Sequence, residues 1–346
     1  MLEANSLWNS FSISDVFGMS VINFYFREKG KAFSIEKIFE ELAESVESSS
    51  ITVRRLYCPF PGGRNLLNVI RNGLWARRNA TELNHITGDA HYLALFLPEN
   101  SCVLTIHDCD MLAPLSGFKR WLVWLIWLYL PVRAAETIIV ISERTKEELC
   151  RITKISGSRV QVIPDFVSDS FEFVPKPAFP EEPRVLVLGT KLNKNISRIV
   201  EALSGLSVEL RIIGKLSTEQ EQLLVESNLK WSNAYQLSDN DIRLEYELCD
   251  FVLFPSLTEG FGMPIVEAQA TGRPIITSNV SPMKEVAGSG ALLVDPESVT
   301  SIRAGVSKLL VDSSIRTRLI EQGRINVEQF RLGHVSEQYQ HVYKRV

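Results

Sequence analysis

The sequence predicts an α/β fold in which two domains each surround a parallel β-sheet with helices. Strand-like and helix-like segments alternate along most of the chain, which is the pattern of parallel strands joined by helices. The chain has 346 residues, more than one hydrophobic core usually serves. Four prolines crowd residues 175–183 and interrupt the alternation, so the best boundary between the two domains lies there.

The strands are expected in short apolar runs. These runs are residues 21–26, 51–57, 83–86, 102–106 and 137–141 in the first half, and 184–189, 208–213, 251–254, 274–277 and 292–294 in the second. We therefore expect an N-terminal domain at 1–168, a linker at 169–183, a C-terminal domain at 184–331 and a final helix within 332–346. Residues 1–18 lack the basic start and apolar core of a signal peptide, so we expect a loose extension or an upstream start there.

The composition is that of an ordinary globular protein. Apolar residues make up 45% of the chain and charged residues 23%, which argues against disorder and against a membrane-spanning bundle. The net charge of −4 gives no general signal for a nucleic-acid partner. The five cysteines are scattered and form no C-x-x-C pair, which fits a reducing compartment. We therefore expect a cytoplasmic protein that binds no nucleic acid.

The segment at residues 251–272 has the pattern of a ligand site. An apolar strand is followed by a Gly-rich loop and by a helix that Pro264 opens and Gly272 ends. No capping side chain precedes Pro264, so the free N–H groups and the dipole of the helix can bind an anion. Glu259 and Glu267 should border the carboxyl end of this strand, where carboxylates can accept hydrogen bonds from sugar hydroxyls.

This segment resembles the donor-site motif of the family 4 (group 1) retaining glycosyltransferases, in which two glutamates eight positions apart flank a Gly-Phe-Gly-x-Pro core. The likeness continues through residues 272–278, 285–286 and 290–296. It implies the GT-B fold, in which two Rossmann-like domains face each other across a cleft and the last helix returns to the first domain. The alternative is an ordinary strand–loop–helix in which Glu267 only complements the helix dipole.

The resemblance also implies which residues bind the donor, a nucleotide-diphosphate sugar. Glu267 would bind the ribose hydroxyls, and Glu259 would bind the hydroxyls of the transferred sugar. The motif adds Gly260, Phe261, Gly262 and Met263 to the donor site. The donor is a co-substrate, and no further cofactor is implied.

A second donor element is expected at residues 189–195, where Gly189 follows a strand and a helix begins. Backbone amides at such a turn can face an anion. The resembled family places a basic pair here against the diphosphate. Lys194 matches one member, and Lys191 would replace an arginine that is common where Thr190 stands. Solvated lysines are the alternative.

No metal site for the diphosphate is expected. The sequence shows no Asp-x-Asp motif that stands out as a divalent metal site. Lysines and a helix dipole can supply the counter-charge instead, so we expect catalysis without a metal ion.

In the first half, His107 and Asp108 follow the strand at 102–106, at the end where α/β folds place ligands. The resemblance implies that His107 lies near the transferred sugar and is a catalytic candidate together with Glu259, while Asp108 and Glu143 line the cleft on the acceptor side. A structural histidine is the alternative. The Gly-rich loop that often follows the family's first strand is missing, since Gly30 is the only glycine in residues 27–34.

Two segments raise the hypothesis of an anionic membrane surface as a partner. Residues 64–78 predict an amphipathic helix inside a stretch, 48–80, that has six arginines and no acidic residue. Residues 121–130 form an apolar run with three tryptophans, too short to span a bilayer. The alternatives are a packed helix with a solvated basic face for the first segment and a buried helix for the second.

Together these features predict a metal-independent, retaining glycosyltransferase of the hexosyltransferase type. It would move a sugar to a hydroxyl of a saccharide or lipid-linked acceptor during bacterial surface polysaccharide or glycolipid assembly, at the inner face of the cytoplasmic membrane if the membrane hypothesis holds. A noncatalytic sugar-nucleotide-binding or partner subunit of the same fold is the alternative. A nicotinamide-dependent dehydrogenase is disfavoured, because no G-x-G-x-x-G follows the first strand.

Overall fold

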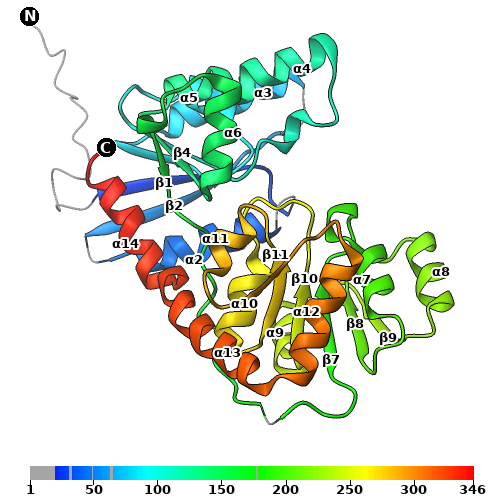
Figure 1. Cartoon of the computed structure of the whole chain (residues 1–346). Helices are drawn as coiled ribbons and strands as arrows, with labels where there is room; N and C mark the ends of the chain where they lie inside the picture. Colours follow the sequence, from blue (N-terminus) through cyan, green and yellow to red (C-terminus); the bar gives the residue numbers. More distant parts are fainter. Residues whose placement is uncertain (1–19, 31–32, 49, 63–64, 177) are drawn as a thin grey trace, which may run out of the picture. The chain divides into compact units, whose positions relative to one another are not determined.

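The computed structural model describes residues 20–30, 33–48, 50–62, 65–176 and 178–346 (Figure 1). They divide into two compact units. Unit 1 comprises the described parts of Met1–Val140, Thr145–Ile163 and Ser336–Val346, and unit 2 comprises Ile141–Arg144 and Pro164–Val335. Each unit is built on one six-stranded sheet. The predicted α/β fold with parallel sheets is thereby confirmed.

The sheet of unit 1 has the order β2-β1-β3-β4-β5-β6, and its strands are parallel. The strands are β1 (Ser20–Phe26), β2 (Ile51–Tyr57), β3 (Leu83–Ile86), β4 (Cys102–Ile106), β5 (Thr137–Val140) and β6 (Val160–Val162). The sequence predicts the first five but misses β6, which has only three residues. The order of the strands reverses between β1 and β3. Open α/β sheets place ligands beyond the carboxyl ends of the strands at such a point.

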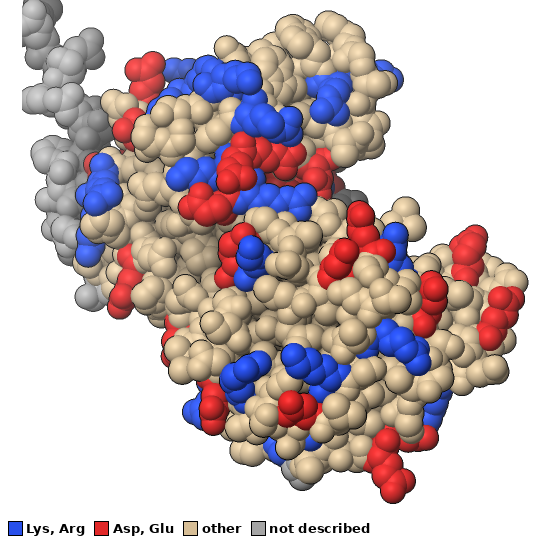
Figure 2. All heavy atoms as spheres, in the orientation of Figure 1, with Lys and Arg blue, Asp and Glu red and all other residues tan. Residues whose placement is uncertain are grey.

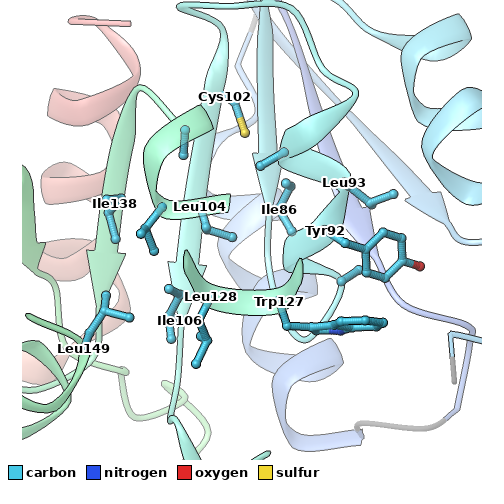
Figure 3. Packing of buried hydrophobic residues seen from close by; sticks show 14 of the residues in the cluster. Ile86, Tyr92, Leu93, Cys102, Leu104, Ile106, Trp127, Leu128, Ile138 and Leu149 are labelled. Atoms are coloured by element: carbon cyan, nitrogen blue, oxygen red, sulfur yellow. The ribbon is translucent and has the colours of Figure 1, made fainter. Parts of the chain in front are cut away.

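The helices of unit 1 pack on this sheet. They are α2 (Phe33–Val46), α3 (Leu66–Asn79), α4 (Gly117–Val123), α5 (Pro131–Ala134) and α6 (Glu143–Thr153), with a π-helix, η3 (Trp124–Tyr129), between α4 and α5. Figure 3 shows Trp127 against Tyr92, with ring centroids 5.2 Å apart. Trp127 is 9% exposed, whereas Trp121 is 48% exposed. Of the predicted tryptophan row, Trp127 therefore belongs to the core, as the alternative of a buried helix proposes.

The sheet of unit 2 has the order β12-β11-β10-β7-β8-β9 and is also parallel. The strands are β7 (Arg184–Leu188), β8 (Glu209–Ile213), β9 (Lys230–Ala234), β10 (Phe251–Phe254), β11 (Ile275–Ser278) and β12 (Leu292–Val294). Only β9 is missing from the predicted runs, because this edge strand has the mostly polar sequence Lys-Trp-Ser-Asn-Ala. The strand order reverses between β7 and β10.

Seven α-helices complete the described part of unit 2: α7 (Ile196–Leu203), α8 (Thr218–Glu226), α9 (Asp239–Leu248), α10 (Met263–Thr271), α11 (Met283–Ala287), α12 (Val299–Val311) and α13 (Ser313–Val327). The bounds of α10 follow the sequence signals closely. Gly262 precedes the helix with φ 113°, and Gly272 ends it with φ 77°, two backbone conformations that glycine adopts at little cost.

The proline-rich segment after residue 168 packs on unit 2 and is not an independent spacer. Phe171 is buried, and the backbone N–H of Val174 donates to the carbonyl of Thr271 over 3.2 Å. The buried guanidinium of Arg273 donates to the carbonyl of Val174 over 2.8 Å. These contacts tie the segment to unit 2, which in the division of the chain includes residues from Pro164 onward.

The last helix, α14 (Leu332–Tyr343), joins unit 1 from Ser336 onward. The hydroxyl of Tyr343 lies 2.7 Å from Nδ1 of the buried His85, whose Nε2 lies 2.8 Å from Oγ1 of Thr105. The ring of Tyr339 packs edge-on against Phe39. Aromatic packing and hydrogen bonds to His85 thus hold the end of the helix against the sheet of unit 1. In the described part of the chain, no helix is both long and apolar enough to cross a membrane.

Candidate functional site

The strand order of the second sheet reverses between β7 and β10, and this point brings together the two predicted donor segments, residues 189–195 and 251–272. Because β7 and β10 are neighbours, the turns that follow them lie side by side. The backbone N–H of Leu257 donates to the carbonyl of Asn193 over 2.8 Å. The Asn193 side chain donates to the carbonyl of Thr258 over 2.9 Å and to Oε1 of Glu259 over 3.1 Å. These bonds fix both turns into one site.

Lys194 and Glu259 form an ion pair within this site. Nζ of Lys194 lies 2.6 Å from Oε1 of Glu259, and the two side chains are only 17% and 15% exposed. The same ammonium group lies 4.6 Å from the centroid of the Phe254 ring. Gly189 has φ 86°, and a Cβ added there would lie 2.8 Å from Cε of Lys194. A glycine at position 189 therefore leaves the space that the lysine occupies.

Lys191 is arranged differently from Lys194. It precedes a short 3-10 helix, η5 (Leu192–Lys194), and its side chain is exposed. Among the residues that the structure describes, no ion pair involves Lys191. The structure therefore brings only one of the two predicted lysines against Glu259.

The motif at the start of α10 would offer a ligand mainly backbone atoms. Gly262 provides no side-chain cap, as expected, and its carbonyl accepts a hydrogen bond from the N–H of Ile265 over 2.9 Å. Phe261 is 4% exposed and packs edge-on against Phe330, so its ring belongs to the core. Gly260 and Met263 are partly exposed. A ligand at this turn would meet the backbone of Phe261 and not its ring.

Glu267 lies in the second turn of α10 and is held by a residue that the sequence analysis missed. The hydroxyl of Tyr246, on α9, donates a hydrogen bond to Oε2 of Glu267. Burial, together with the neighbouring carboxylate, raises the pKa of Tyr246 well above its usual value, so the hydroxyl keeps its proton. Tyr246 fixes the orientation of the carboxylate that is predicted to bind ribose. A single tyrosine within a helix gives no sequence signal for this role.

Unit 1 has a cavity of about 440 Å³ at the reversal point of its own sheet. Arg27 follows β1 and Asp89 follows β3; both line this cavity, and their side chains form an ion pair. Asp108, after β4, also lines the cavity. Partial desolvation raises the pKa of its carboxyl group, which keeps an exposed surface. The remaining lining residues are Gly62, Ala90, Tyr92, Met111, Val123 and Trp127.

The other two predicted residues of the first half lie apart from this lining. Nε2 of His107 lies 3.1 Å from the carbonyl oxygen of Thr87, and its ring packs edge-on against Phe39. Glu143 is the exposed first residue of α6 and groups with unit 2 in the division of the chain. The structure therefore supports Asp108 as a cavity residue and leaves the roles of His107 and Glu143 as predictions.

Sequence reasoning missed most of the cavity. Arg27 lies in the loop that lacks the family's glycines, and Asp89 follows a strand as a single acidic residue, so neither stands out. Trp127 lies within an apolar run and has no separate signal in the sequence. In the described part of the chain, no cluster of three or more His, Cys, Asp or Glu side chains is arranged to hold a metal ion.

Two family models match this chain and together cover both halves. The model for Glycosyl transferases group 1 matches residues 169–326, and the model for Glycosyltransferase Family 4 matches residues 38–171. The chain belongs to the group 1, family 4 glycosyltransferases. The two matches meet at residues 169–171, close to Pro164, from which the chain runs within unit 2.

Two relatives of this glycosyltransferase are named as mannosyltransferases. The serotype-specific mannosyltransferase WbdA of Escherichia coli is 29% identical over 211 residues, which are 54% of this chain and 26% of WbdA. The O-antigen chain mannosyltransferase B of Escherichia coli is 27% identical over 232 residues, which are 61% of each protein. The chain thus spans about a quarter of one relative and three fifths of the other.

A solved structure confirms the fold. Alr3699/HepE of Anabaena, in complex with UDP and glucose, matches 95% of this glycosyltransferase and 100% of its own chain, with a TM-score of 0.74 and 16% identity. Such a likeness shows the fold alone, which is the GT-B fold.

Proposed function

We propose that this family 4 glycosyltransferase transfers a sugar from a nucleotide-diphosphate sugar, bound by unit 2, to a hydroxyl of a saccharide acceptor, bound by unit 1. The observation that carries the proposal is the Lys194–Glu259 pair at the reversal point of the second sheet. It combines a cation for a diphosphate with a carboxylate for sugar hydroxyls at the place where α/β sheets bind nucleotides.

The donor contacts follow from the chemistry of the site. Lys194 and the positive end of the α10 dipole supply positive charge for the diphosphate. Glu259 accepts hydrogen bonds from the hydroxyls of the transferred sugar. Glu267, oriented by Tyr246, accepts them from the ribose. The solved complex of HepE with UDP and glucose supports a donor of this class.

The acceptor site is the cavity of unit 1. Saccharides bind to proteins through apolar ring faces and through hydroxyl groups. The cavity offers the aromatic rings of Tyr92 and Trp127, together with the carboxylates of Asp89 and Asp108 and the guanidinium of Arg27. Its volume of about 440 Å³ is within the range of small-molecule pockets. In this proposal His107 contacts the transferred sugar.

The reaction retains the configuration of the sugar and needs no metal ion. The bond from C1 to the diphosphate oxygen breaks, the acceptor oxygen bonds to C1 on the same face, and the acceptor proton passes to a phosphate oxygen of the leaving group. Lys194 and the dipole of α10 stabilise the charge that develops on the departing diphosphate.

The biological context is the assembly of a surface polysaccharide or glycolipid. Two relatives are named as mannosyltransferases, and one of them acts on O-antigen chains by its name. A lipid-linked acceptor would place the reaction at the inner face of the cytoplasmic membrane, with the protein peripherally attached.

A screen of donors tests this proposal. UDP-, GDP- and ADP-sugars are each tested for thermal stabilisation of the protein and for hydrolysis or transfer, and the anomeric configuration of the product is read by NMR. We expect one nucleotide series to stabilise the protein and to yield a product with the anomeric configuration of the donor. Inversion would contradict the mechanism. Binding without turnover under all conditions would favour the noncatalytic alternative.

A further inference from the structure

The turn at residues 257–262, which we call the donor turn, is held by two side chains from the start of α6. Nη1 of Arg144 donates a hydrogen bond to the carbonyl of Glu259 over 3.3 Å. The hydroxyl of Ser142 donates to the next carbonyl, that of Gly260, over 2.9 Å. Carbonyl groups in a turn need partners outside helices and strands, so the side chains that bind them determine the path of the turn.

Arg144 also connects the donor turn with a second loop of unit 2. Its Nη1 donates to the carbonyl of Ser281, between β11 and α11, over 3.1 Å. Among the residues that the structure describes, no ion pair involves Arg144. The guanidinium therefore uses its charge on backbone carbonyls. Hydrogen bonds from a charged donor are stronger than those between neutral groups, so the two loops are firmly joined.

Glu259 is thus held through its backbone as well as through its side chain. Asn193 and Lys194 bind its carboxylate, and Arg144 binds its carbonyl. A shift of the backbone would carry the carboxylate away from the position in which it meets sugar hydroxyls. Hydrogen bonds weaken steeply as their geometry is distorted, so the backbone contact bears on binding of the sugar.

Arg144 lies beside a residue that the sequence analysis selects. The division of the chain assigns residues 141–144 to unit 2, together with the donor turn. Glu143, the predicted cleft residue, is exposed, whereas Arg144 is partly buried and Ser142 is 6% exposed. The contacts of this segment with the donor turn therefore come from the two neighbours of Glu143.

The charge on the surface of unit 2 does not form a broad basic patch on the face drawn in Figure 2. In the part of that view where Figure 1 draws unit 2, Lys and Arg side chains are scattered among acidic and uncharged ones. Long-range attraction is weak on such a surface. Recognition of the donor then depends on where individual groups of the site lie.

We propose that Arg144 is a positioning residue of the donor site: it holds the backbone of Glu259 so that the carboxylate meets the hydroxyls of the transferred sugar. Ser142 assists by fixing the next carbonyl of the donor turn. The inference rests on the proposed donor role of Glu259 and extends it to the residues that set its position. Arg144 acts on recognition of the sugar half of the donor, because its hydrogen bond goes to the residue that binds this half.

Calorimetric titration with matched ligands tests the proposal. The probes are the pairs UDP and UDP-glucose, and GDP and GDP-mannose, whose members differ by the sugar. Arg144→Ala should lower the affinity for the nucleotide-sugar about tenfold and that for the nucleoside diphosphate less than about twofold. Arg144→Lys keeps the charge but cannot reach both carbonyls in the same geometry, so we expect an intermediate loss. Arg151→Ala, at an exposed arginine of the same helix, is the matched control.

A double-mutant cycle tests whether Arg144 acts through Glu259. In a Glu259→Gln background, Arg144→Ala should cost less than about twofold in affinity for the nucleotide-sugar, because the charged acceptor that it positions is already lost. Equal losses in the two backgrounds would show that Arg144 acts on another group and would overturn the proposal. Thermal melting shows that each variant is folded at the temperature of the titration.

Hydrogen–deuterium exchange tests the positioning without a ligand. Arg144→Ala should speed the exchange of backbone amides in the donor turn, while Arg151→Ala should not. Unchanged exchange would overturn the proposal. Equal losses of affinity for the nucleoside diphosphate and the nucleotide-sugar would also overturn it, since they indicate a direct contact to the diphosphate or a general loosening of unit 2. A wild-type protein that binds no nucleotide-sugar would contradict the proposed function, and the exchange result would then decide the role of Arg144 by itself.

Discussion

Nζ of Lys194 lies 2.6 Å from Oε1 of Glu259, so two residues that the family motif treats as separate donor contacts form one ion pair. Each neutralises the other while both are mostly buried. Removing one partner of such a pair leaves the other as an uncompensated charge, which costs more than the pair itself contributes. A donor diphosphate would attract the same ammonium group, so donor binding and the ion pair are coupled.

The first prediction concerns Lys194. Lys194→Ala should lower the turnover number more than the affinity for the donor, because its charge acts mainly on the departing diphosphate. The loss of a charge-assisted hydrogen bond corresponds to about 1.5 to 3 kcal/mol in the activation free energy. Steady-state kinetics and calorimetry measure the two quantities separately. Lys191→Ala, in the same turn but without an ion pair to Glu259, is the matched control and should have a smaller effect. Equal losses in turnover and affinity would indicate simple ground-state binding.

The second prediction concerns the contact between Tyr246 and Glu267. Glu267→Ala should weaken donor binding by about 1.5 to 3 kcal/mol, because the ribose hydroxyls lose a charged acceptor. Tyr246→Phe keeps the carboxylate but frees its orientation, so we expect a smaller loss of about 1 kcal/mol. Calorimetric titration with the nucleotide diphosphate gives both values. Tyr235→Phe, at an exposed tyrosine of the same unit, serves as the control. Unchanged affinity in Glu267→Ala would remove this residue from the donor site.

Local signals in the sequence predict a helix end or a strand where one residue type determines the local backbone conformation. Pro264 and Gly272 mark the ends of α10 to within one residue, and the apolar runs identify ten of the twelve strands found in the described residues. The two missed strands, β6 and β9, are short or polar and are held by their neighbours in the sheet. Tertiary context, and not local pattern, makes them strands.

Contacts between distant segments could not be predicted in the same way. The pairing of Lys194 with Glu259 depends on β7 and β10 being neighbours, which neither segment encodes alone. Similarly, Arg27 and Asp89 meet because β1 and β3 are adjacent. The sequence therefore predicts which residue types belong to the candidate donor site, while the sheet order determines which of their side chains touch.

The third prediction concerns acid stability. Burial lowers the pKa of His85 to about 3, and burial also lowers the pKa of His91. Both histidines stay neutral in the folded state but bind a proton in the unfolded chain below about pH 6.5. The contribution of these neutral histidines to the free energy of unfolding is therefore fully present above that pH. As the pH falls from there toward the folded-state pKa, each histidine lowers the free energy of unfolding by about 1.4 kcal/mol per pH unit.

Urea denaturation at several pH values, followed by tryptophan fluorescence, measures this effect. His91→Gln should reduce the dependence of the unfolding free energy on pH below pH 6.5. His334→Gln, at an exposed histidine, is the control for the substitution itself. A wild-type stability that does not change between pH 7 and pH 5 would contradict the neutral, buried state of the two histidines.

The fourth prediction concerns metal ions. If Lys194 and the start of α10 supply the counter-charge for the diphosphate, excess EDTA should leave the initial rate of transfer nearly unchanged. The rate is measured with purified protein before and after dialysis against EDTA. Loss of activity that magnesium restores would show that a metal ion takes part.

The last prediction concerns the acceptor cavity of unit 1. Asp108→Asn keeps the size of the side chain but removes its charge, so it should weaken hydrogen bonds to acceptor hydroxyls. We expect the KM for the acceptor to rise about tenfold, corresponding to roughly 1.4 kcal/mol, while the KM for the donor stays the same. Asp110→Asn changes an exposed carboxylate two residues away that does not line the cavity, and it is the matched control. Trp127→Phe tests the aromatic wall with a smaller ring that still fills part of the core. It should also raise the acceptor KM, and a thermal melt shows how far a loss of packing contributes. If Asp108→Asn raised the KM of the donor and left that of the acceptor unchanged, the cavity would belong to the donor and the assignment of the two ligands to the two units would be wrong.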